Sequence, residues 1–352
     1  MSVFPRLVSP ETYRACDTDL LTNEPARAYW LGLFASHFDV QLKAARDAGI
    51  SEDAIAAARD AWRDEMRAFH DDHARFGRLD ILLLDERRSD VLISNGVTDE
   101  FRVIKARENE RALSMLPVWI ERLEREQGDS FWSTLMCGML AGNLFDMGVT
   151  STADVFAGGP LAFEDMLERV PPRPWFVDGL ASLDAMMART SPRRTVILAD
   201  NAGADVVLGV LPLAWAMLRQ DPASEVVIAA NETPSLNDIT IDELRSLREA
   251  ASAVVPALQD SRLSLVSSGT GAPLIDLSAI GLELAEASEN ADFVVLVGMG
   301  RSIESNWSAR FSCPSLRVAL LKDPQVAATI GGRLFDAVIR FEGADGTTGD
   351  PG

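Results

Sequence analysis

The segment TVILADNAGADVVLGVLPLAWAMLR, residues Thr195 to Arg219, contains the transition that decides the fold. A short run of β-branched and apolar residues, Thr195–Ala199, leads into Asp200-Asn201-Ala202-Gly203 and then into the apolar stretch Val206–Arg219. The first run is typical of a buried strand, and the later stretch has the length of a helix. Gly203 gives the backbone room to turn between them. The segment therefore predicts a strand, a tight turn and a helix, the unit from which parallel α/β sheets are built.

The same alternation continues toward the C-terminus. Five further short apolar runs predict strands at Glu225–Ala230, Leu263–Ser267, Phe293–Val297, Arg317–Lys322 and Ala337–Phe341. Helical patterns at Ile241–Leu258 and Ser278–Ala287 lie between them. Near-continuous apolar strands that alternate with helices indicate a sheet covered on both faces. We therefore expect a Rossmann-like, doubly wound parallel α/β sheet.

The residues before this segment have helical periodicity instead. Apolar positions recur at helical spacing in Pro25–Ala48, Ser51–Phe69, Arg107–Glu126, Phe131–Met147 and Asp178–Arg189. Ser51 is suited to be the N-cap of the second of these helices. We expect a helical N-terminal region at 1–190, an α/β domain at 191–342 and a flexible tail at 343–352, where Gly, Thr and Asp predominate.

Composition and charge restrict the class of protein. Apolar residues make up 47% of the 352 residues, enough for a full hydrophobic core. No run approaches the roughly 20 apolar residues needed to cross a bilayer, and the first residues lack a signal-peptide pattern, so we expect a cytoplasmic protein. The net charge of −20 disfavours nucleic acids and anionic membranes as partners. A phosphorylated ligand would need local cations or a metal ion to offset this charge.

Several familiar catalytic patterns are absent from the sequence. The three cysteines, Cys16, Cys137 and Cys313, are far apart and form no CxxC pair, which argues against a disulfide framework or a cysteine zinc site. His37, His70 and His73 all lie in the helical region, so a histidine relay on the α/β domain is not expected. The HExxH, GxSxG, GxxxxGK[ST] and Asp-x-Asp-x-Thr patterns are missing. A phospho-aspartate intermediate is therefore disfavoured.

Polar residues follow the first two predicted strands. Asp200 and Asn201 come directly after the first, and Asp238 follows the second, just before Thr240 and Glu243, which predict a helix-capping box. Ligands of open parallel sheets bind at the carboxyl ends of the strands. Two carboxylates and an amide oxygen suit Mg²⁺ or Mn²⁺ and leave coordination positions for a phosphate oxygen and a water. An ordinary turn followed by an ordinary N-cap would give the same local patterns, so the metal-site hypothesis rests on their meeting at one sheet edge.

Cations are expected at the same edge. Gly298-Met299-Gly300-Arg301 follows the fourth predicted strand, and Lys322 ends the fifth. Arg301 could hold phosphate oxygens bidentately, with Lys322 as a second point charge, or it could simply pair with an acidic residue. The two glycines lack the third glycine of a dinucleotide fingerprint. We assign Gly298, Gly300 and Glu304 to the substrate-binding group.

Several segments together carry a resemblance to a known family. They are Tyr29-Trp30, Lys105–Asn109, Leu140–Asp146, Arg173–Trp175, Ala199–Gly203, Pro234–Thr240, Gly298–Arg301, Gly331–Phe335 and Phe341-Glu342. In their order and spacing the chain resembles the metal-dependent damage-control phosphatases, formerly a domain of unknown function. It is most similar to the subgroup that also occurs fused behind a pantothenate kinase domain.

The resemblance implies a divalent metal ion (Mn, Mg, Co or Ni) at the positions matched by Asp200, Asn201 and Asp238. It also implies that Asn143 and Asp146, which match a Gly-Asn-x-x-Asp motif, reach the same cleft from the helical region. The residues alone indicate only a buried polar pair on a helix. A third group from the resembling segments either closes the cleft from above or pairs along its own helix. This group consists of Lys105, Glu108 and Asn109.

Substrates implied by the resemblance are small phosphorylated metabolites. The fused subgroup implies 4′-phosphopantetheine or its oxidised forms, and other branches imply sugar phosphates. Two departures bear on substrate identity. Relatives in the subgroup commonly have Glu at the position of Val297 and Asn at the position of Asp323.

We therefore expect metal-assisted hydrolysis of a phosphomonoester. Asp238 or Asp146 would orient the attacking water, and Asn143, Arg301 and Lys322 would complete the catalytic group. One alternative is a non-catalytic protein that binds a phosphometabolite. Val297 is the reason to consider it, because relatives commonly have a carboxylate at this position. A second is an S-adenosylmethionine-dependent methyltransferase with Gly-Met-Gly at a strand end, although acidic residues at ribose-binding spacing are not evident. The oligomeric state is not indicated.

Overall fold

The computed structural model describes residues 1–126, 128–144 and 163–344 of the chain. These residues form a seven-stranded sheet with the spatial order β1-β7-β6-β5-β2-β3-β4. The strands are β1 (Val177–Asp178), β2 (Arg194–Leu198), β3 (Glu225–Ala230), β4 (Leu263–Ser267), β5 (Phe293–Val297), β6 (Ser315–Leu320) and β7 (Ala337–Glu342). Every predicted strand is present close to its expected bounds. The predicted α/β fold is confirmed.

Two strands, β7 and the unpredicted β1 beside it, run opposite to the other five, which departs from the predicted parallel arrangement. β7 runs antiparallel to β6, whereas the other neighbouring pairs, including β1 with β7, are parallel. The chain turns back beside β6 because Leu321 pairs through its backbone with Phe335 and Asp336. Strand β1 comes from the region that we describe as helical, and its two residues are too few to give a periodic signal.

Helices cover both faces of the sheet. They are α4 (Arg102–Arg125), α5 (Asp129–Leu144), α7 (Phe163–Arg169), α8 (Leu180–Arg189), α9 (Leu211–Gln220), α10 (Ile241–Val254), α11 (Leu282–Ser288) and α12 (Pro324–Thr329). Alternate residues of β2 belong to different cores. Ile197 packs in the core with α4, α5, α8, α9 and α10, whereas Val196 and Leu198 pack in the core with α11 and with Phe4. This alternation is what a strand buried on both faces requires.

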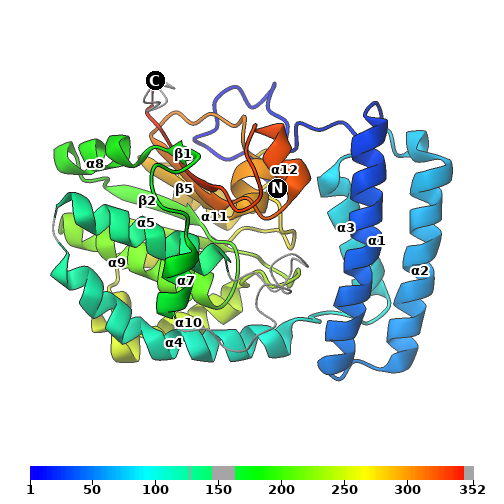
Figure 1. The fold of residues 1–352 in the computed structure, drawn as a ribbon, viewed down its shortest axis with the longest axis horizontal. Coiled ribbons are helices and arrows are strands. Elements are labelled where there is room, and N and C mark those ends of the chain that lie inside the picture. The colour runs from blue at the N-terminus through cyan, green and yellow to red at the C-terminus, as the bar shows by residue number, and fades with distance from the viewer. Residues whose placement is uncertain (127, 145–162, 345–352) are drawn as a thin grey trace.

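A unit of three helices stands beside the sheet. We call it the cap: α1 (Glu24–Asp47), α2 (Glu52–Asp71) and α3 (Ile81–Ser94), which Figure 1 shows together at one end of the molecule. The predicted N-cap is present, since the Ser51 side chain accepts from the backbone N–H of Ala54. Phe38 of α1 stacks on Trp62 of α2 with ring centroids 5.0 Å apart. These contacts give the cap its own core, which also reaches the sheet edge.

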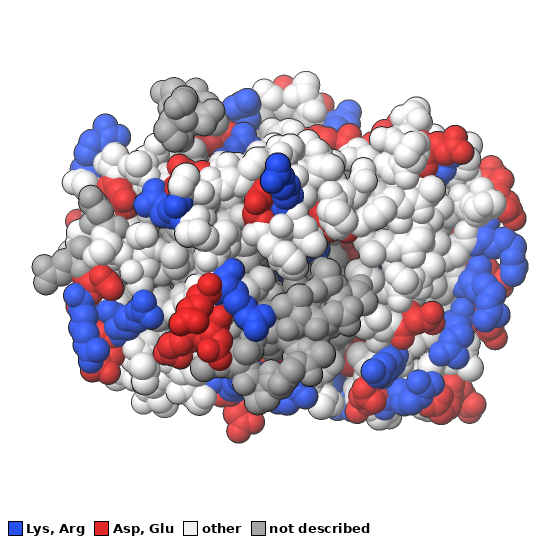
Figure 2. Space-filling view, in the orientation of Figure 1, with Lys and Arg blue, Asp and Glu red and all other residues white. Residues whose placement is uncertain are grey.

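The outer face of α2 is charged and exposed. Arg63 pairs with Asp60 and Arg67 with Asp64, each one helical turn apart and open to solvent. Figure 2 shows acidic and basic side chains interspersed along this part of the surface. In the part of the chain that the structure describes, no helix combines the length and the apolar character needed to cross a membrane.

Apart from short 3₁₀- and π-helical turns, four described elements are additional to the predicted ones: α3, α7, α12 and β1. Three of them are too short for periodicity, and the apolar positions of α3 are interrupted by charged residues. The predicted helix Val206–Arg219 begins as a π-helical turn, η2 (Asp205–Val210), and continues as α9. The boundary that we place near residue 190 stays a prediction, although α4, α5 and α8 pack directly on the sheet.

Helix α5 approaches the start of η2 so closely that a glycine is required. A Cβ on Gly142 would lie 2.7 Å from the carbonyl oxygen of Ala204 and 3.0 Å from the Cα of Asp205. We expect Gly142→Ala to lower the free energy of unfolding by about 1–3 kcal/mol, because overpacking forces the backbones apart. Urea denaturation measures this change.

Gly32→Ala on α1 is the matched control. No atom lies within 4 Å of its Cβ position, so alanine there should raise the free energy of unfolding by roughly 0.5–1 kcal/mol through helix propensity. Equal effects of the two substitutions would contradict the close packing of α5.

Candidate functional site

The candidate site lies where the order of the strands reverses. From β2 the chain continues to β3 and β4 on one side of the sheet, and β5 and β6 lie on the other. Such a switch point leaves a crevice at the carboxyl ends of the strands. The polar residues predicted to form a site follow β2, β3 and β5, which are the strands around this crevice.

Backbone pairing joins the loops that follow β2 and β3. Asn201 and Asp238 form an isolated antiparallel bridge, and the N–H of Ile239 donates to the carbonyl oxygen of Asp200 at 3.0 Å. The predicted capping box is present at Thr240 and fixes the start of α10. The structure thus brings together the three residues proposed as metal ligands.

Arg301 links the two carboxylates of this group. Its guanidinium, 2% exposed, donates through Nη1 to Asp200 and through Nη2 to Asp238 at 2.8 Å and to Asn231 Oδ1 at 2.9 Å. Burial disfavours its positive charge, but the charges of Asp238 and Asp200 more than offset this and raise its pKa. Arg301 therefore orients the two carboxylates. Its partners are side chains of the protein itself, whereas phosphate oxygens were one possibility predicted from the sequence.

The glycines after β5 allow this approach. Gly298 has a φ of +87°, and a Cβ there would lie 1.9 Å from Oδ2 of Asp200. A Cβ on Gly300 would lie 2.8 Å from the carbonyl oxygen of Pro273. The chain continues as a second π-helical turn, η4 (Gly300–Glu304). These glycines are needed because the protein itself fills the space beside them.

Asn143 reaches the site from the end of α5, as the resemblance implies. Its Nδ2 donates to Asp205 at 3.0 Å and to Oδ2 of Asp200 at 3.4 Å. Asp205 is a buried carboxyl whose pKa is raised to about 7, by burial first and then by the charge of Asp200. Asp146 lies outside the described residues.

Lys322 supplies a buried positive charge at the end of β6. Its side chain is 2% exposed and donates to the carbonyl oxygen of Asn143 at 3.0 Å. The neighbouring Asp323, a departure from the family pattern, accepts from the hydroxyl of Tyr29 at 2.6 Å and from the first N–H groups of α12. The carboxylate of Asp323 is therefore the N-cap of α12, and its hydrogen bond from Tyr29 links α12 to helix α1. Val297, the other departure, is buried within β5.

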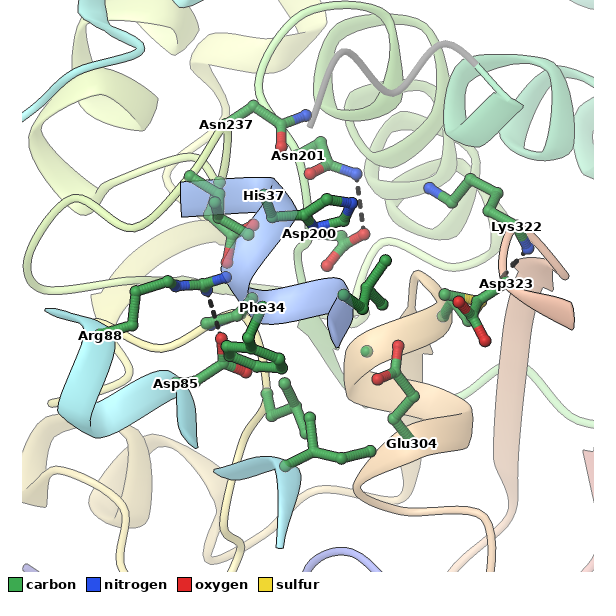
Figure 3. A pocket seen from close by; sticks show the side chains of 18 of the residues that line it. Phe34, His37, Asp85, Arg88, Asp200, Asn201, Asn237, Glu304, Lys322 and Asp323 are labelled. Atoms are coloured by element: carbon green, nitrogen blue, oxygen red, sulfur yellow. Dashed lines mark hydrogen bonds and ion pairs between the residues drawn. The ribbon is translucent and has the colours of Figure 1, made fainter. Parts of the chain in front are cut away.

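A pocket of about 110 Å³ opens between these strand ends and the cap. Figure 3 shows its lining, with polar side chains on the sheet side and aromatic and charged side chains on the cap side. The sheet side contributes Asp200, Asn201, Leu236, Asn237, Asp238, Pro273, Leu274, Met299, Gly300, Glu304, Lys322 and Asp323, and the cap contributes Trp30, Leu33, Phe34, His37, Ile81, Asp85 and Arg88. Both parts of the chain therefore line the pocket.

Helix α4 holds the strand-end loops from above. Lys105, 1% exposed, pairs with Asp99 at 3.2 Å and with Glu243 of the capping box at 2.9 Å. It thus braces the start of α10 and does not line the pocket. A direct role for Lys105 in substrate binding stays a prediction.

Glu108 and Asn109 lie on the same helix, above the turn after β2. Asn109 Oδ1 accepts from the backbone N–H of Gly203 at 2.6 Å, and a Cβ on Gly203 would lie 3.0 Å from the Cβ of Glu108. The Glu108 carboxylate pairs with the exposed Arg107 at 3.2 Å. These contacts position the Asp200 loop, and substrate contact by either residue stays a prediction.

The donor groups suit a hard divalent cation. Because one guanidinium contacts both Asp200 and Asp238, the two carboxylates lie within reach of a single positive charge, with Asn201 beside them. Within the described ranges, no group of three or more His, Cys, Asp or Glu side chains is placed to hold a metal. Two carboxylates and an amide oxygen leave most of the coordination shell to water and substrate, as Mg²⁺ prefers. The residues present fit such an ion.

Sequence reasoning missed several residues of the site. His37, Asp85 and Arg88 come from the cap, and their helical spacing with apolar residues is that of an ordinary core face. Asp205 offered a signal, because it is a lone carboxylate at the start of the otherwise apolar stretch Val206–Leu218.

Glu304 lines the pocket, and the pKa of its carboxyl is raised. Burial, followed by the charges of Asp323, Asp85 and Asp200, raises its pKa from 4.5 to about 8, although Lys322 acts in the opposite direction. From about pH 4.5 to 8 the folded protein retains a proton that the unfolded chain releases. Its stability therefore falls as the pH rises through this window.

We expect Glu304→Gln to remove this contribution. In EDTA, the variant should gain stability over the unsubstituted protein as the pH is raised from 5 to 8, measured by urea unfolding at each pH. Glu286→Gln on the exposed side of α11 is the control and should show no such gain. A pH-independent difference for Glu304→Gln would contradict the raised pKa.

Comparison with known proteins places this geometry in a family. The sequence model of one protein family, the damage-control phosphatase ARMT1-like domain, matches residues 41–338. Damage-control phosphatase At2g17340 of Arabidopsis thaliana is 34% identical over 97% of this chain and 97% of its own length. Pantothenate kinase 2 of the same plant is 34% identical over 97% of this chain, and the 4′-phosphopantetheine phosphatase of Mus musculus is 28% identical over 96%. The chain spans 42% and 48% of these two longer proteins.

The fold has a solved counterpart. The crystal structure of a DUF89 family protein from Pyrococcus horikoshii aligns with a TM-score of 0.62, covering 88% of this chain and 96% of that one at 20% identity. At that identity the likeness supports the fold alone. The family match over most of the chain and the near full-length similarity to the plant phosphatase confirm the resemblance seen in the sequence: this chain belongs to the damage-control phosphatase ARMT1-like family.

Proposed function

We propose that this protein is a divalent-metal-dependent phosphatase that hydrolyses phosphomonoesters of small metabolites. The observation that carries the proposal is the meeting of Asp200, Asn201 and Asp238 beside a pocket that also contains Lys322. Family membership supports the phosphatase class. We propose Mg²⁺, Mn²⁺, Co²⁺ or Ni²⁺ as the metal, because the donors are hard oxygens with an open shell.

The substrate is proposed from both the pocket and the relatives. A relative from mouse is named 4′-phosphopantetheine phosphatase, and two plant relatives are named pantothenate kinase. We propose 4′-phosphopantetheine or its damaged forms as the first candidate, with sugar phosphates as the second. The pocket lies between the strand ends and the cap, so a phosphoester bound at the strand ends would have its alcohol part beside the cap.

The chain's own residues prepare the site for phosphoryl transfer to water. When bound, the metal would polarise a phosphate oxygen and lower the pKa of a bound water. Lys322 provides a positive charge for the phosphoryl oxygens, which offsets the acidic surroundings. Arg301 fixes the orientation of both carboxylates. We propose that Asp238 orients the attacking water, with Asp146, which lies outside the described residues, as the alternative. Apolar side chains of the cap keep bulk water away from the phosphoryl group.

Two alternatives lead to different measurements. The Gly-Met-Gly segment is the feature that suggested a methyltransferase. It does not form an open cradle for a cofactor, because Gly298 and Gly300 pack against Asp200 and Pro273. A non-catalytic binding protein would bind phosphoesters in this pocket without releasing phosphate, and the assay below distinguishes it.

Removal of the metal should abolish turnover. We expect EDTA-treated protein to release no phosphate from 4′-phosphopantetheine or from an aryl phosphate, and we expect at least one of the four divalent ions to restore release. Asp200→Asn should lower kcat/KM by at least about 100-fold, about 2.7 kcal/mol of transition-state stabilisation. Circular dichroism checks its folding.

Asp242→Asn is the matched control, because this aspartate lies close by in α10 but is exposed and pairs with Arg245 on the same helix. It should retain full activity. Full activity of Asp200→Asn, or turnover that persists in EDTA, would eliminate the metal site proposed here.

Lys322→Met should weaken the phosphoryl contact. We expect kcat/KM to fall by about 10- to 100-fold, since one buried charge is lost from the site, about 1.4–2.7 kcal/mol. Phosphate-release kinetics with saturating metal measure it. Lys43→Met on the exposed face of α1 is the control. An unchanged kcat/KM for Lys322→Met would place the phosphoryl group elsewhere.

A further inference from the structure

Glu304 borders two cavities of the molecule. Trp30, Ile81 and Glu304 line both the pocket at the strand ends and a second cavity of about 120 Å³, which we call the side cavity. The polar part of the side cavity consists of Asp17, Thr18, Gln325 and Thr329 together with Glu304. Of the three residues that the cavities share, Glu304 alone has a side chain that can take up and release a proton.

The Glu304 carboxyl faces the pocket. The residue ends η4, three positions after Arg301, and its side chain is only partly buried because it borders the two cavities. In Figure 3 the carboxyl points from η4 into the pocket, toward the space between Asp200 and Asp323. A ligand atom bound beside Asp200 on this side of the pocket would lie next to the carboxyl.

This carboxyl differs from its neighbours in having no partner from the protein. Asp85 pairs with Arg88 in the same pocket. Asp323 accepts from the hydroxyl of Tyr29 at 2.6 Å. Among the described residues, none donates a hydrogen bond to the Glu304 carboxyl or forms an ion pair with it. A polar group that faces a pocket without a protein partner is placed to serve a ligand.

Glu304 is also a carboxylic acid at neutral pH. The charged and titratable groups around it are Asp85, Asp200, Asp323, Lys322, Tyr29 and Cys16. Its pKa is raised to about 8, by burial first and then by the three aspartates, whereas the lysine acts in the opposite direction. The tyrosine and the cysteine have raised pKa values and stay neutral. A divalent ion and a phosphomonoester dianion have opposite charges, so binding both changes the local charge little.

We propose that Glu304 is the proton donor to the leaving group. Its carboxyl contacts the ester oxygen of the bound phosphomonoester and protonates that oxygen as its bond to phosphorus breaks. General acids of this kind need a proton near the working pH and a position within hydrogen-bond reach of the leaving atom. The inference rests on the proposed function for the position of the phosphoryl group, and it gives Glu304 a catalytic role beyond substrate binding.

The step balances without a further reactant. The oxygen of the attacking water bonds to phosphorus, one of its protons stays on the phosphate and the other is released to solvent. The ester oxygen leaves as the alcohol with the proton of Glu304, which becomes a carboxylate. The side cavity then lets Glu304 regain a proton while the pocket is occupied, because Asp17 and Thr329 in its lining are exposed to solvent.

Two esters with different leaving groups test the proposal. Butyl phosphate would release a strongly basic alkoxide unless its oxygen is protonated, whereas 4-nitrophenyl phosphate releases a stable phenolate that needs no proton. Glutamine has the shape of glutamate but no proton to transfer. With the divalent ion that supports the fastest release, we expect Glu304→Gln to lower kcat/KM for butyl phosphate at least about 100-fold and to leave 4-nitrophenyl phosphate within about threefold.

Asp323→Asn is the matched control for charge. It removes the carboxylate that most strongly affects Glu304 after burial, and asparagine keeps the ability to cap α12. Both esters should change by the same factor, within about threefold. Glu286→Gln on the exposed side of α11 should change neither ester. A selective loss of butyl phosphate in Asp323→Asn as large as that in Glu304→Gln would overturn the proton transfer, because charge alone would then account for it.

Infrared spectroscopy observes the proton without turnover. On addition of inorganic phosphate to the protein loaded with the same ion, the difference spectrum should contain the carbonyl band of a protonated carboxyl that is absent from Glu304→Gln. Calorimetry of metal binding should give the same affinity for this variant as for the unsubstituted protein, which also shows that it is folded.

Three results would overturn the proton donor and leave the phosphatase intact. They are equal losses of the two esters in Glu304→Gln, an unchanged infrared spectrum in that variant, and a loss of its metal affinity, which would make Glu304 a metal ligand. Failure of the proposed function looks different, because the unsubstituted protein would then release phosphate from neither ester with any of the ions.

Discussion

The site depends on the buried guanidinium of Arg301 between Asp200 and Asp238. Two carboxylates from neighbouring strand ends repel each other strongly in a poorly hydrated crevice, and one cation between them reverses the sign of that interaction. The contact also explains the choice of residues around it. Gly298 must lack a side chain so that β5 can deliver Arg301 beside Asp200, and Asn231 supplies an acceptor for the remaining donor. Burying this group without its partners would be strongly unfavourable.

Much of this arrangement could be predicted, because most of the residues involved come directly after predicted strands. Apolar runs separated by helices predict a parallel sheet, and the carboxyl ends of such strands meet at one edge, so Asp200, Asn201 and Asp238 could be grouped without a structure. The partners of Arg301 could not be predicted, because a sequence specifies that a cation is present and not which of many acids it meets. The antiparallel direction of β7 was missed for a similar reason, since a chain reversal at Leu321 depends on tertiary contacts.

The cap shows a different limit of sequence reasoning. The apolar stripe of α1 that contains Trp30 and Phe34 has the periodicity of a core face, and much of it does pack in a core. Periodicity distinguishes a buried face from an exposed one, but a pocket wall and a core are both apolar. Asp85 and Arg88 have the spacing of an ordinary surface ion pair, and only their burial sets them apart. Residues that a second structural unit contributes to a site are therefore the hardest to find from sequence.

The charges around the pocket bear on why a metal ion is proposed. Apart from Glu304, which keeps its proton up to about pH 8, the described carboxylates that line it are Asp85, Asp200, Asp238 and Asp323, whereas the lining cations are Arg88 and Lys322. Arg301 behind the wall reduces this excess, and the buried carboxyl of Asp205 adds to it once the pH exceeds its raised pKa of about 7. An anionic phosphate would enter this surplus of negative charge only if a further cation accompanied it, since one lysine cannot offset both the phosphate and the carboxylates. A divalent ion among Asp200, Asn201 and Asp238 would supply that charge at the atoms where it is needed. The acidity of the chain thus supports a metal-assisted site over one built from basic side chains alone.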